Sequence, residues 1–153
     1  MRKQLLKVGD VFAIKLEDNL FGFAVVCEGG DFAFIDFHSN KAKVPDDFLS
    51  NKVAFRIFVA AGEPESSKWN KIGTLQLERE MLQPAKYLHK PIGSDRVYTF
   101  CNGESSPAEM SEVKDLEVLS SWAALHAEKR LKDFFMGEEN EYVIAIKKQL
   151  KIK

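Results

Sequence analysis

Asp36 and His38 are the residues of this sequence whose types and spacing most directly suggest chemistry. They follow an apolar run, and in an extended strand residues two apart point to the same face. A carboxylate beside an imidazole can act as a general acid–base couple. One interpretation is therefore a hydrolase with both side chains in a cleft. The same pair is typical of the solvated end of a strand, and this is the interpretation we favour.

Other catalytic motifs are missing from the sequence. It contains no phosphate-binding loop, no dinucleotide fingerprint, no paired-cysteine zinc motif and no nucleophile elbow. His38, His89 and His126 have no ligand-like spacing, and Cys27 and Cys101 lie far apart in apolar segments. We expect no metal ion, no cofactor and no catalytic residue. We expect both cysteines to pack as small hydrophobic side chains, with a reactive thiol as the alternative for Cys101, which precedes the turn Asn102-Gly103.

The charge is unevenly distributed, although the net charge of the chain is only −1. Residues 1–102 carry a net charge of +1, residues 103–141 carry −6, and residues 142–153 carry +4. An acidic surface can attract a basic partner, and it can equally be a solvated face. The candidate interface residues are Glu104, Glu109, Glu112, Asp115, Glu117, Glu138 and Glu139, with Trp122 as a candidate aromatic anchor.

The elements that would position these residues begin with strands. Residues 11–17 and 21–28 alternate between two faces, and the polar turn 18–20 between them predicts a hairpin. A glycine turn at 28–31 leads to a third strand at 32–38, which completes a meander. Further strands are predicted at 52–60, 72–77, 96–101 and 142–146, whereas the segment between Pro84 and Pro91 is predicted to be irregular.

A helix is predicted from Ser120 or Ser121, either of which can cap its N-terminus, to about Met136, with Gly137 as the stop. Its apolar side chains form one stripe, which should pack on the sheet. The stripe is Ala123, Ala124, Ala127, Leu131, Phe134 and Phe135, with Glu128, Lys129, Lys132 and Asp133 on the opposite side and Trp122 and Leu125 outside it.

The composition fits one globular domain over residues 1–153, since 45% of the residues are hydrophobic and 29% are charged. We predict an α+β fold, with a curled antiparallel sheet or partial barrel of about five to seven strands and one long C-terminal helix. No signal peptide and no apolar run of membrane-spanning length is seen, so we expect a cytoplasmic protein.

Three segments together resemble the immunity protein 26 family of bacterial polymorphic toxin systems. They are "VGDVFAIKLEDNLFGFAVV", "WNKIGTLQLE" and "LEVLSSWAALHAEKRLKDFFMG", the last holding Trp122, His126 and Arg130. The resemblance extends over residues 7–137.

This resemblance implies a binding protein, not an enzyme, of the kind found in polymorphic toxin systems and contact-dependent inhibition. It would neutralise a cognate toxin domain by occluding its active site. If the toxin is a basic nuclease, the acidic residues 103–141 would speed its association. The net charge of −1 gives no overall field that would draw the chain to nucleic acid or membrane, so we expect direct contact with neither.

An alternative from the residues alone is a small ligand-binding or nucleic-acid-binding β-barrel. Basic residues gathered on one sheet face, with an exposed Phe21 or Phe32, would favour it.

Overall fold

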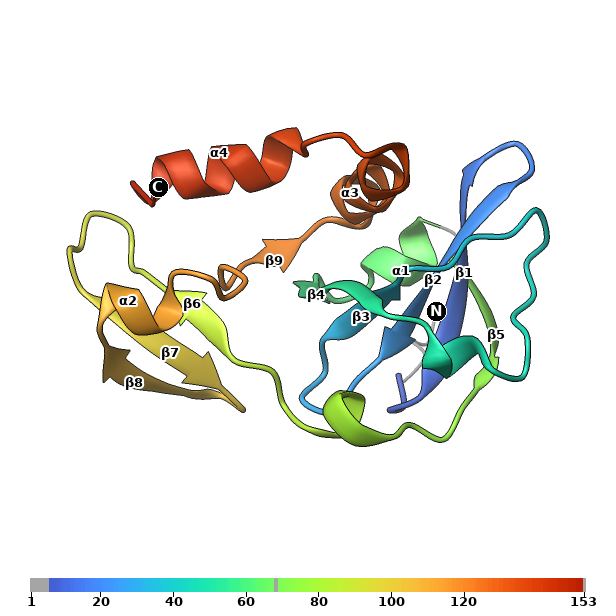
Figure 1. The fold of residues 1–153 in the computed structure, drawn as a ribbon, viewed down its shortest axis with the longest axis horizontal. Coiled ribbons are helices and arrows are strands. Elements are labelled where there is room, and N and C mark those ends of the chain that lie inside the picture. Colours follow the sequence, from blue (N-terminus) through green and yellow to red (C-terminus); the bar gives the residue numbers. More distant parts are fainter. Residues whose placement is uncertain (1–5, 68, 153) are drawn as a thin grey trace.

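The computed structural model describes residues 6–67 and 69–152, and it places two sheets side by side with helices above them (Figure 1). The larger sheet has six strands in the order β5-β1-β2-β3-β4-β9, and the smaller has the order β6-β7-β8. The strands of the larger sheet are β1 (Asp10–Glu17), β2 (Leu20–Val26), β3 (Phe32–Ile35), β4 (Val53–Val59), β5 (Asn70–Thr74) and β9 (Ser121–Trp122).

The larger sheet starts with the predicted hairpin. β1 and β2 pair antiparallel, with Val11 opposite Val25 and Lys15 opposite Phe21, and Asn19 adopts a positive φ of 62° in the turn. β3 and β4 continue this antiparallel order. β9 pairs with β4 in parallel, so the sheet is mixed and the purely antiparallel prediction is wrong at this edge. The predicted α+β class with a curled sheet is confirmed.

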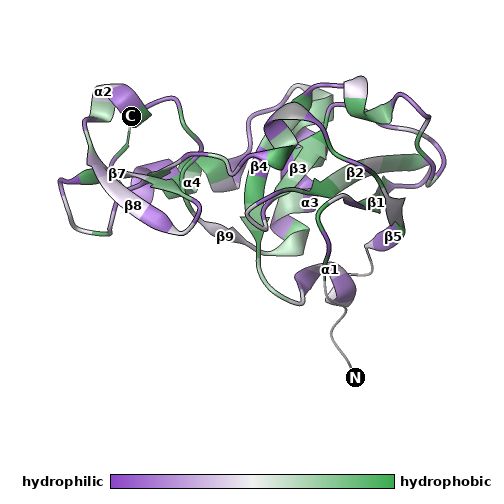
Figure 2. Ribbon diagram, turned by 90° about the horizontal axis from the view of Figure 1, so that it is seen from below, coloured by the Kyte–Doolittle hydropathy of each residue, from purple (hydrophilic) through white to green (hydrophobic). Residues whose placement is uncertain are grey.

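Both faces of the larger sheet are apolar and both are covered, which explains why both sets of alternating residues in its strands are hydrophobic (Figure 2). On one face, Phe12, Phe34 and Phe55 belong to a cluster that includes residues of helix α3 (Ala124–Met136). On the other face, Phe23 and its neighbours are covered by the segments 37–49 and 72–81.

The smaller sheet contains β6 (Tyr87–His89), β7 (Val97–Cys101) and β8 (Glu104–Ala108), all antiparallel. Only β7 was predicted, and the prediction of irregular structure before Pro91 is wrong because β6 lies there. The short helix α2 (Met110–Val113) follows β8. Leu88, Val97 and Val113 form the core of this lobe with residues from the C-terminal end of the chain.

Helix α3 starts later than predicted. Ser121 and Trp122 extend the larger sheet by pairing with Phe58 and Val59, so neither Ser120 nor Ser121 caps the helix. Ala123 occupies the N-cap position without a side-chain hydrogen bond. The predicted end is confirmed, since Gly137 has a φ of 70°.

The apolar stripe predicted for α3 is confirmed at the centre of the helix and is wrong at its C-terminal end. Ala124, Ala127 and Leu131 are fully buried, whereas Phe134 is 41% exposed. Asp133, which was predicted to be on the outer side, is 2% exposed.

The predicted strand at 142–146 is wrong, because this segment belongs to helix α4 (Glu141–Gln149). The Asn140 side chain caps the helix by accepting hydrogen bonds at 3.0 Å from the backbone N–H groups of Tyr142 and Val143. Asn140 also donates to Asp133 at 2.9 Å, which explains why that carboxylate is buried. The tight turn between α3 and α4 thus determines which side of α3 is covered.

A buried ion pair of the larger lobe is joined to the smaller sheet by a hydrogen bond from Tyr87. Asp31 has a side chain only 2% exposed, and it accepts two hydrogen bonds from Arg56, 2.6 Å from Nε and 2.9 Å from Nη2. The Tyr87 hydroxyl of the smaller sheet donates to the same carboxylate. Arg56 also donates to the backbone carbonyls of Glu28, Glu80 and Gln83, so its guanidinium connects β4 to two other segments, 28–31 and 80–83.

Two ionisable groups near this ion pair, Cys27 and Tyr87, have raised pKa values. We therefore predict that the protein loses stability at alkaline pH. Burial raises the pKa of the Cys27 thiol to about 11, and burial followed by the hydrogen bond to Asp31 raises the pKa of the Tyr87 phenol well above its ordinary value. As the pH passes about 9, the unfolded chain releases protons that the native state retains. The free energy of unfolding should therefore fall with rising pH above that point.

Urea melts between pH 7 and pH 10 measure this loss. Cys27→Ala serves as the control, since it removes the thiol contribution and should flatten the curve between pH 9 and pH 10. A wild-type curve that stays level to pH 10 would contradict the prediction.

Candidate partner-binding surface

Four of the predicted interface residues gather on the smaller lobe. Glu104 begins β8, Glu109 and Glu112 lie at the start of α2, and Asp115 follows that helix. All four side chains are exposed. The backbone N–H of Glu109 donates to the Glu112 carboxylate at 2.9 Å, so these two acids also stabilise the start of α2. The local sequence therefore places four exposed acids on the smaller lobe, one at the start of β8 and three in and after α2.

The other acids of the predicted stretch do not join this group. Glu138 and Glu139 are exposed in the turn between α3 and α4, which Figure 1 shows above the larger sheet and away from β8 and α2. Lys147 of α4 lines the same cavity as Asp115 and Glu117. The basic end of the chain thus folds back toward the acidic residues, and the charge surplus of 103–141 is not one continuous surface.

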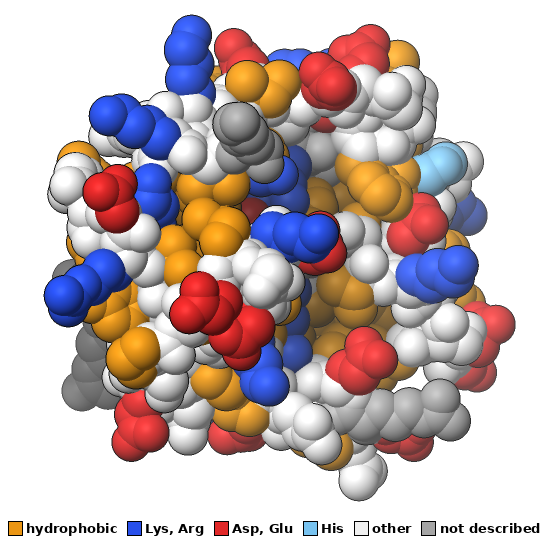
Figure 3. Space-filling view, turned by 60° about the vertical axis from the view of Figure 1, so that its left-hand side comes forward, with side chains coloured by type: hydrophobic (Ala, Val, Ile, Leu, Met, Phe, Trp, Pro, Cys, Tyr) orange, Lys and Arg blue, Asp and Glu red, His pale blue; other side chains and the backbone are white. Residues whose placement is uncertain are grey.

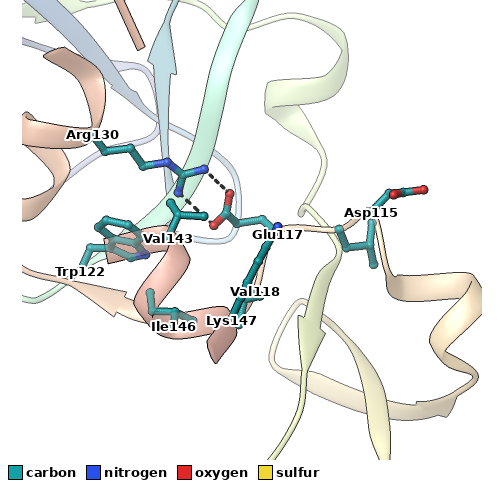
Figure 4. A pocket seen from close by; sticks show the side chains of 9 residues that line it. Asp115, Glu117, Val118, Trp122, Arg130, Val143, Ile146 and Lys147 are labelled. Carbon is teal, nitrogen blue, oxygen red and sulfur yellow. Dashed lines mark hydrogen bonds and ion pairs between the residues drawn. The ribbon is translucent and has the colours of Figure 1, made fainter. Parts of the chain in front are cut away.

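Glu117 is paired inside the molecule. Its carboxylate accepts two hydrogen bonds from Arg130, at 2.7 and 2.9 Å (Figure 4). The guanidinium of Arg130 lies 4.2 Å from the ring centre of Phe55 and 5.1 Å from that of Trp122. Since Trp122 is 3% exposed, it is a core residue, and its proposed role as a surface anchor is wrong.

A groove missed from the sequence lies beside the acidic residues. It has a volume of ≈ 470 Å³, and apolar side chains at its walls are flanked by charged ones. Met110, which is 37% exposed, and Tyr98 contribute to it. Its lining residues are Asp95, Arg96, Val97, Tyr98, Pro107, Ala108, Glu109 and Met110. An apolar groove with a charged rim is suited to binding a protein side chain. It could not be predicted because it depends on the pairing of β7 with β8.

Asp36 and His38 follow β3 at the surface, and both side chains are exposed. The His38 ring contacts Phe135 edge-on, with the ring centres 4.9 Å apart. Neither side chain lines the groove of the smaller sheet or the cavity beside Glu117. Across residues 6–67 and 69–152, no group of three His, Cys, Asp or Glu side chains is arranged to hold a metal ion.

The exposed phenylalanine that would favour the β-barrel alternative is not seen among the described residues. Phe32 is 1% exposed, and Phe21 is half-buried against the core. The larger sheet is open, since β5 and β9 form its two edges in the part of the chain that the structure describes.

The fold is α+β, and its smaller sheet carries a groove with charged residues among its lining. Residues 7–97 match the family model described as Immunity protein 26. The match covers more than half of the chain, and this protein therefore belongs to the immunity protein 26 family. No curated protein and no solved structure matches the chain. Family membership supports a role in immunity without catalysis.

The matched segment ends at Val97, in β7. It contains β1–β6, whereas the eight candidate residues lie beyond it. None of the helices in the described part of the chain is long and apolar enough to cross a bilayer.

Proposed function

We propose that this protein is a cytoplasmic immunity protein of a bacterial polymorphic toxin system, of the contact-dependent type, and that it binds one cognate toxin domain. Its membership of the immunity protein 26 family is the observation that carries this proposal. The mechanism is occlusion, in which a rigid surface covers the active site of the toxin. Neither Asp36 nor His38 is required, because inhibition by occlusion needs no turnover.

The surface we propose for this contact is the smaller lobe, which carries the exposed Glu104, Glu109, Glu112 and Asp115. It also carries the groove of Tyr98 and Met110, with Glu109 in its wall. Exposed acids attract a basic partner over distances of about 8 Å at physiological salt. A toxin that acts on nucleic acid, such as a nuclease, must itself present positive charge to its substrate. An acidic inhibitor would then compete with that substrate for the same surface.

We further propose that residues 1–153 act as one domain. α4 supports this, since Val143 and Ile146 pack on the core of the larger sheet while Ile146 and Leu150 pack on that of the smaller one. A helix shared by two cores couples the lobes.

Reversing the charge of Glu104 and Asp115 to lysine should lower the association rate with the toxin domain about ten-fold or more at low salt. Both residues are exposed, and neither takes part in an ion pair or hydrogen bond between side chains of the described residues. Stopped-flow kinetics with an inactivated form of the toxin domain encoded beside this gene measures the rate. At about 1 M salt, where the Debye length is near 3 Å, the variant and the wild type should converge.

The double reversal Glu138→Lys with Glu139→Lys is the matched control, since it makes the same change in net charge at the turn between α3 and α4. It should change the association rate much less. If both double variants lowered the association rate equally, only the net charge of the protein would matter. That result would contradict an interface on the smaller lobe. If the wild type does not bind this toxin domain at all, the proposed function itself fails for that partner.

A further inference from the structure

The two faces of the smaller sheet carry different side chains. In β7, Tyr98 and Phe100 are two residues apart, so their side chains point to the same face, and the residues opposite them share that face. His89 pairs with Tyr98, and Tyr87 pairs with Phe100. Val97 points to the other face, which packs on the core of the smaller lobe. One face of the sheet is therefore covered by its own lobe, and the other carries a row of aromatic side chains.

This row continues onto the larger lobe. The ring of Phe58, in β4, lies 5.1 Å from that of Tyr87 and 6.3 Å from that of Phe100, measured between ring centres. At the other end, the rings of His89 and Tyr98 lie 5.9 Å apart. Tyr87 is buried, whereas the other four rings are half-buried. We call these four the aromatic strip: Phe58, Phe100, Tyr98 and His89.

The aromatic strip is left over after the fold has formed its cores. In the part of the chain that the structure describes, Phe58, Tyr98 and Phe100 pack in none of the three apolar cores. Phe58 and Phe100 line a cavity of ≈ 150 Å³ at the junction of the lobes, and Tyr98 lines the groove of ≈ 470 Å³. A space-filling view toward the smaller lobe shows hydrophobic side chains in hollows between charged ones (Figure 3). Aromatic side chains that the fold itself does not cover are typical of protein interfaces.

The charges beside the aromatic strip favour a basic partner. Glu28 lines the cavity, and Asp95 and Glu109 line the groove together with one cation, Arg96. None of these four side chains takes part in an ion pair between described residues. Asp31 also lines the cavity, but its charge is balanced within the buried ion pair described above. Three acids and one cation leave a net charge of −2 on the lining of the two hollows.

We propose that the aromatic strip is the surface that retains the toxin domain after encounter, and that it receives apolar side chains from a basic face of that domain. This inference rests on the proposed function and extends it, because it adds Phe58 and the junction of the lobes to the contact. Aromatic side chains that become buried in an interface commonly dominate its binding energy, whereas exposed charges act mainly on encounter. The acids therefore raise the association rate, and the aromatic strip slows dissociation.

Two truncations test this assignment. Tyr98→Ala and Phe100→Ala should each speed dissociation of an inactivated toxin domain about ten-fold or more. The effect should persist at about 1 M salt, because salt screens charges and does not weaken an apolar contact. Tyr98→Phe retains the ring and should dissociate like the wild type. Phe134→Ala removes a ring that is 41% exposed on α3, so it is the matched control and should leave the rate unchanged. Stopped-flow displacement measures each rate, and circular dichroism checks each fold.

The possible outcomes separate this inference from the proposed function. If both alanine variants dissociate at the wild-type rate, or if their effect disappears at high salt, the aromatic strip is not the retaining surface and the proposed function still stands. If Phe100→Ala does not fold, Tyr98→Ala decides the test. A wild type that does not bind the toxin domain would refute the proposed function for that partner, and this inference with it. A wild-type dimer that Tyr98→Ala converts to monomer in sedimentation would assign the strip to a second copy, and would also overturn the inference.

Discussion

Arg56→Met should lower the free energy of unfolding by about 3–5 kcal/mol, because it leaves the buried Asp31 carboxylate without its cation. The Asp31 side chain is 2% exposed and that of Arg56 is 13% exposed, so water cannot replace the lost hydrogen bonds. The substitution would also remove the hydrogen bonds that Arg56 donates to the backbone carbonyls of Glu28, Glu80 and Gln83. Urea denaturation at pH 7 measures the effect.

Arg96→Met is the matched control. Arg96 is exposed at the edge of the smaller lobe, and it makes no ion pair with another described residue. Its replacement should change stability by less than about 0.5 kcal/mol. The double variant Asp31→Leu with Arg56→Met should recover part of the loss, since it removes both charges together. Equal costs for the two arginine substitutions would show that the buried pair does not stabilise the junction of the lobes.

Leu131→Ala should cost about 2–5 kcal/mol, the range for a buried leucine whose removal leaves a cavity. Leu131 is fully buried at the centre of the α3 face that packs on the larger sheet. Its Cδ2 atom comes so near to Gly22 that a Cβ atom at that glycine would lie only 2.5 Å away. Contact this close means that the alanine variant cannot refill the space without moving the helix. Thermal and urea melts measure the loss.

Lys132→Ala supplies the comparison from the adjacent position. Its ammonium pairs with Glu17 at 2.7 Å, but the two side chains are 37% and 49% exposed. An exposed pair of this kind contributes about 0–1 kcal/mol. If Lys132→Ala costs as much as Leu131→Ala, then the orientation of α3 on the sheet is wrong.

Strands β1 to β4 of the larger sheet could be predicted because their signal is local. Alternation in residues 11–17 and 21–28 identifies the hairpin without knowledge of the rest of the chain. The 142–146 segment shows the limit of this reasoning. Its Val143, Ile144 and Ile146 favour a strand by propensity, yet Asn140 caps a helix there and the two lobes provide apolar surfaces for it.

The candidate surface was only partly predictable for a related reason. Counting charges along the chain located Glu104 and Asp115, which are exposed. The same count included Glu117, whose partner Arg130 lies on a different element. Trp122 fell outside the predicted helix stripe, which suggested a surface role. It is buried because it ends a strand, and that strand forms only through pairing with β4.

The parallel pairing of β9 with β4 has a consequence for the timing of protection. The chain builds five strands of the larger sheet, leaves it to form the smaller one, and returns after residue 120 with β9 and α3 to cover the apolar face. At a synthesis rate of 5–20 residues per second, residues 98–153 emerge about 3–11 s after the segment that matches the family. During that interval Phe55 and its neighbours lack the cover that α3 gives them. Under the function proposed above, protection then depends on molecules completed earlier. A chain that ends before α3 leaves its ribosome without the cover that its sheet requires.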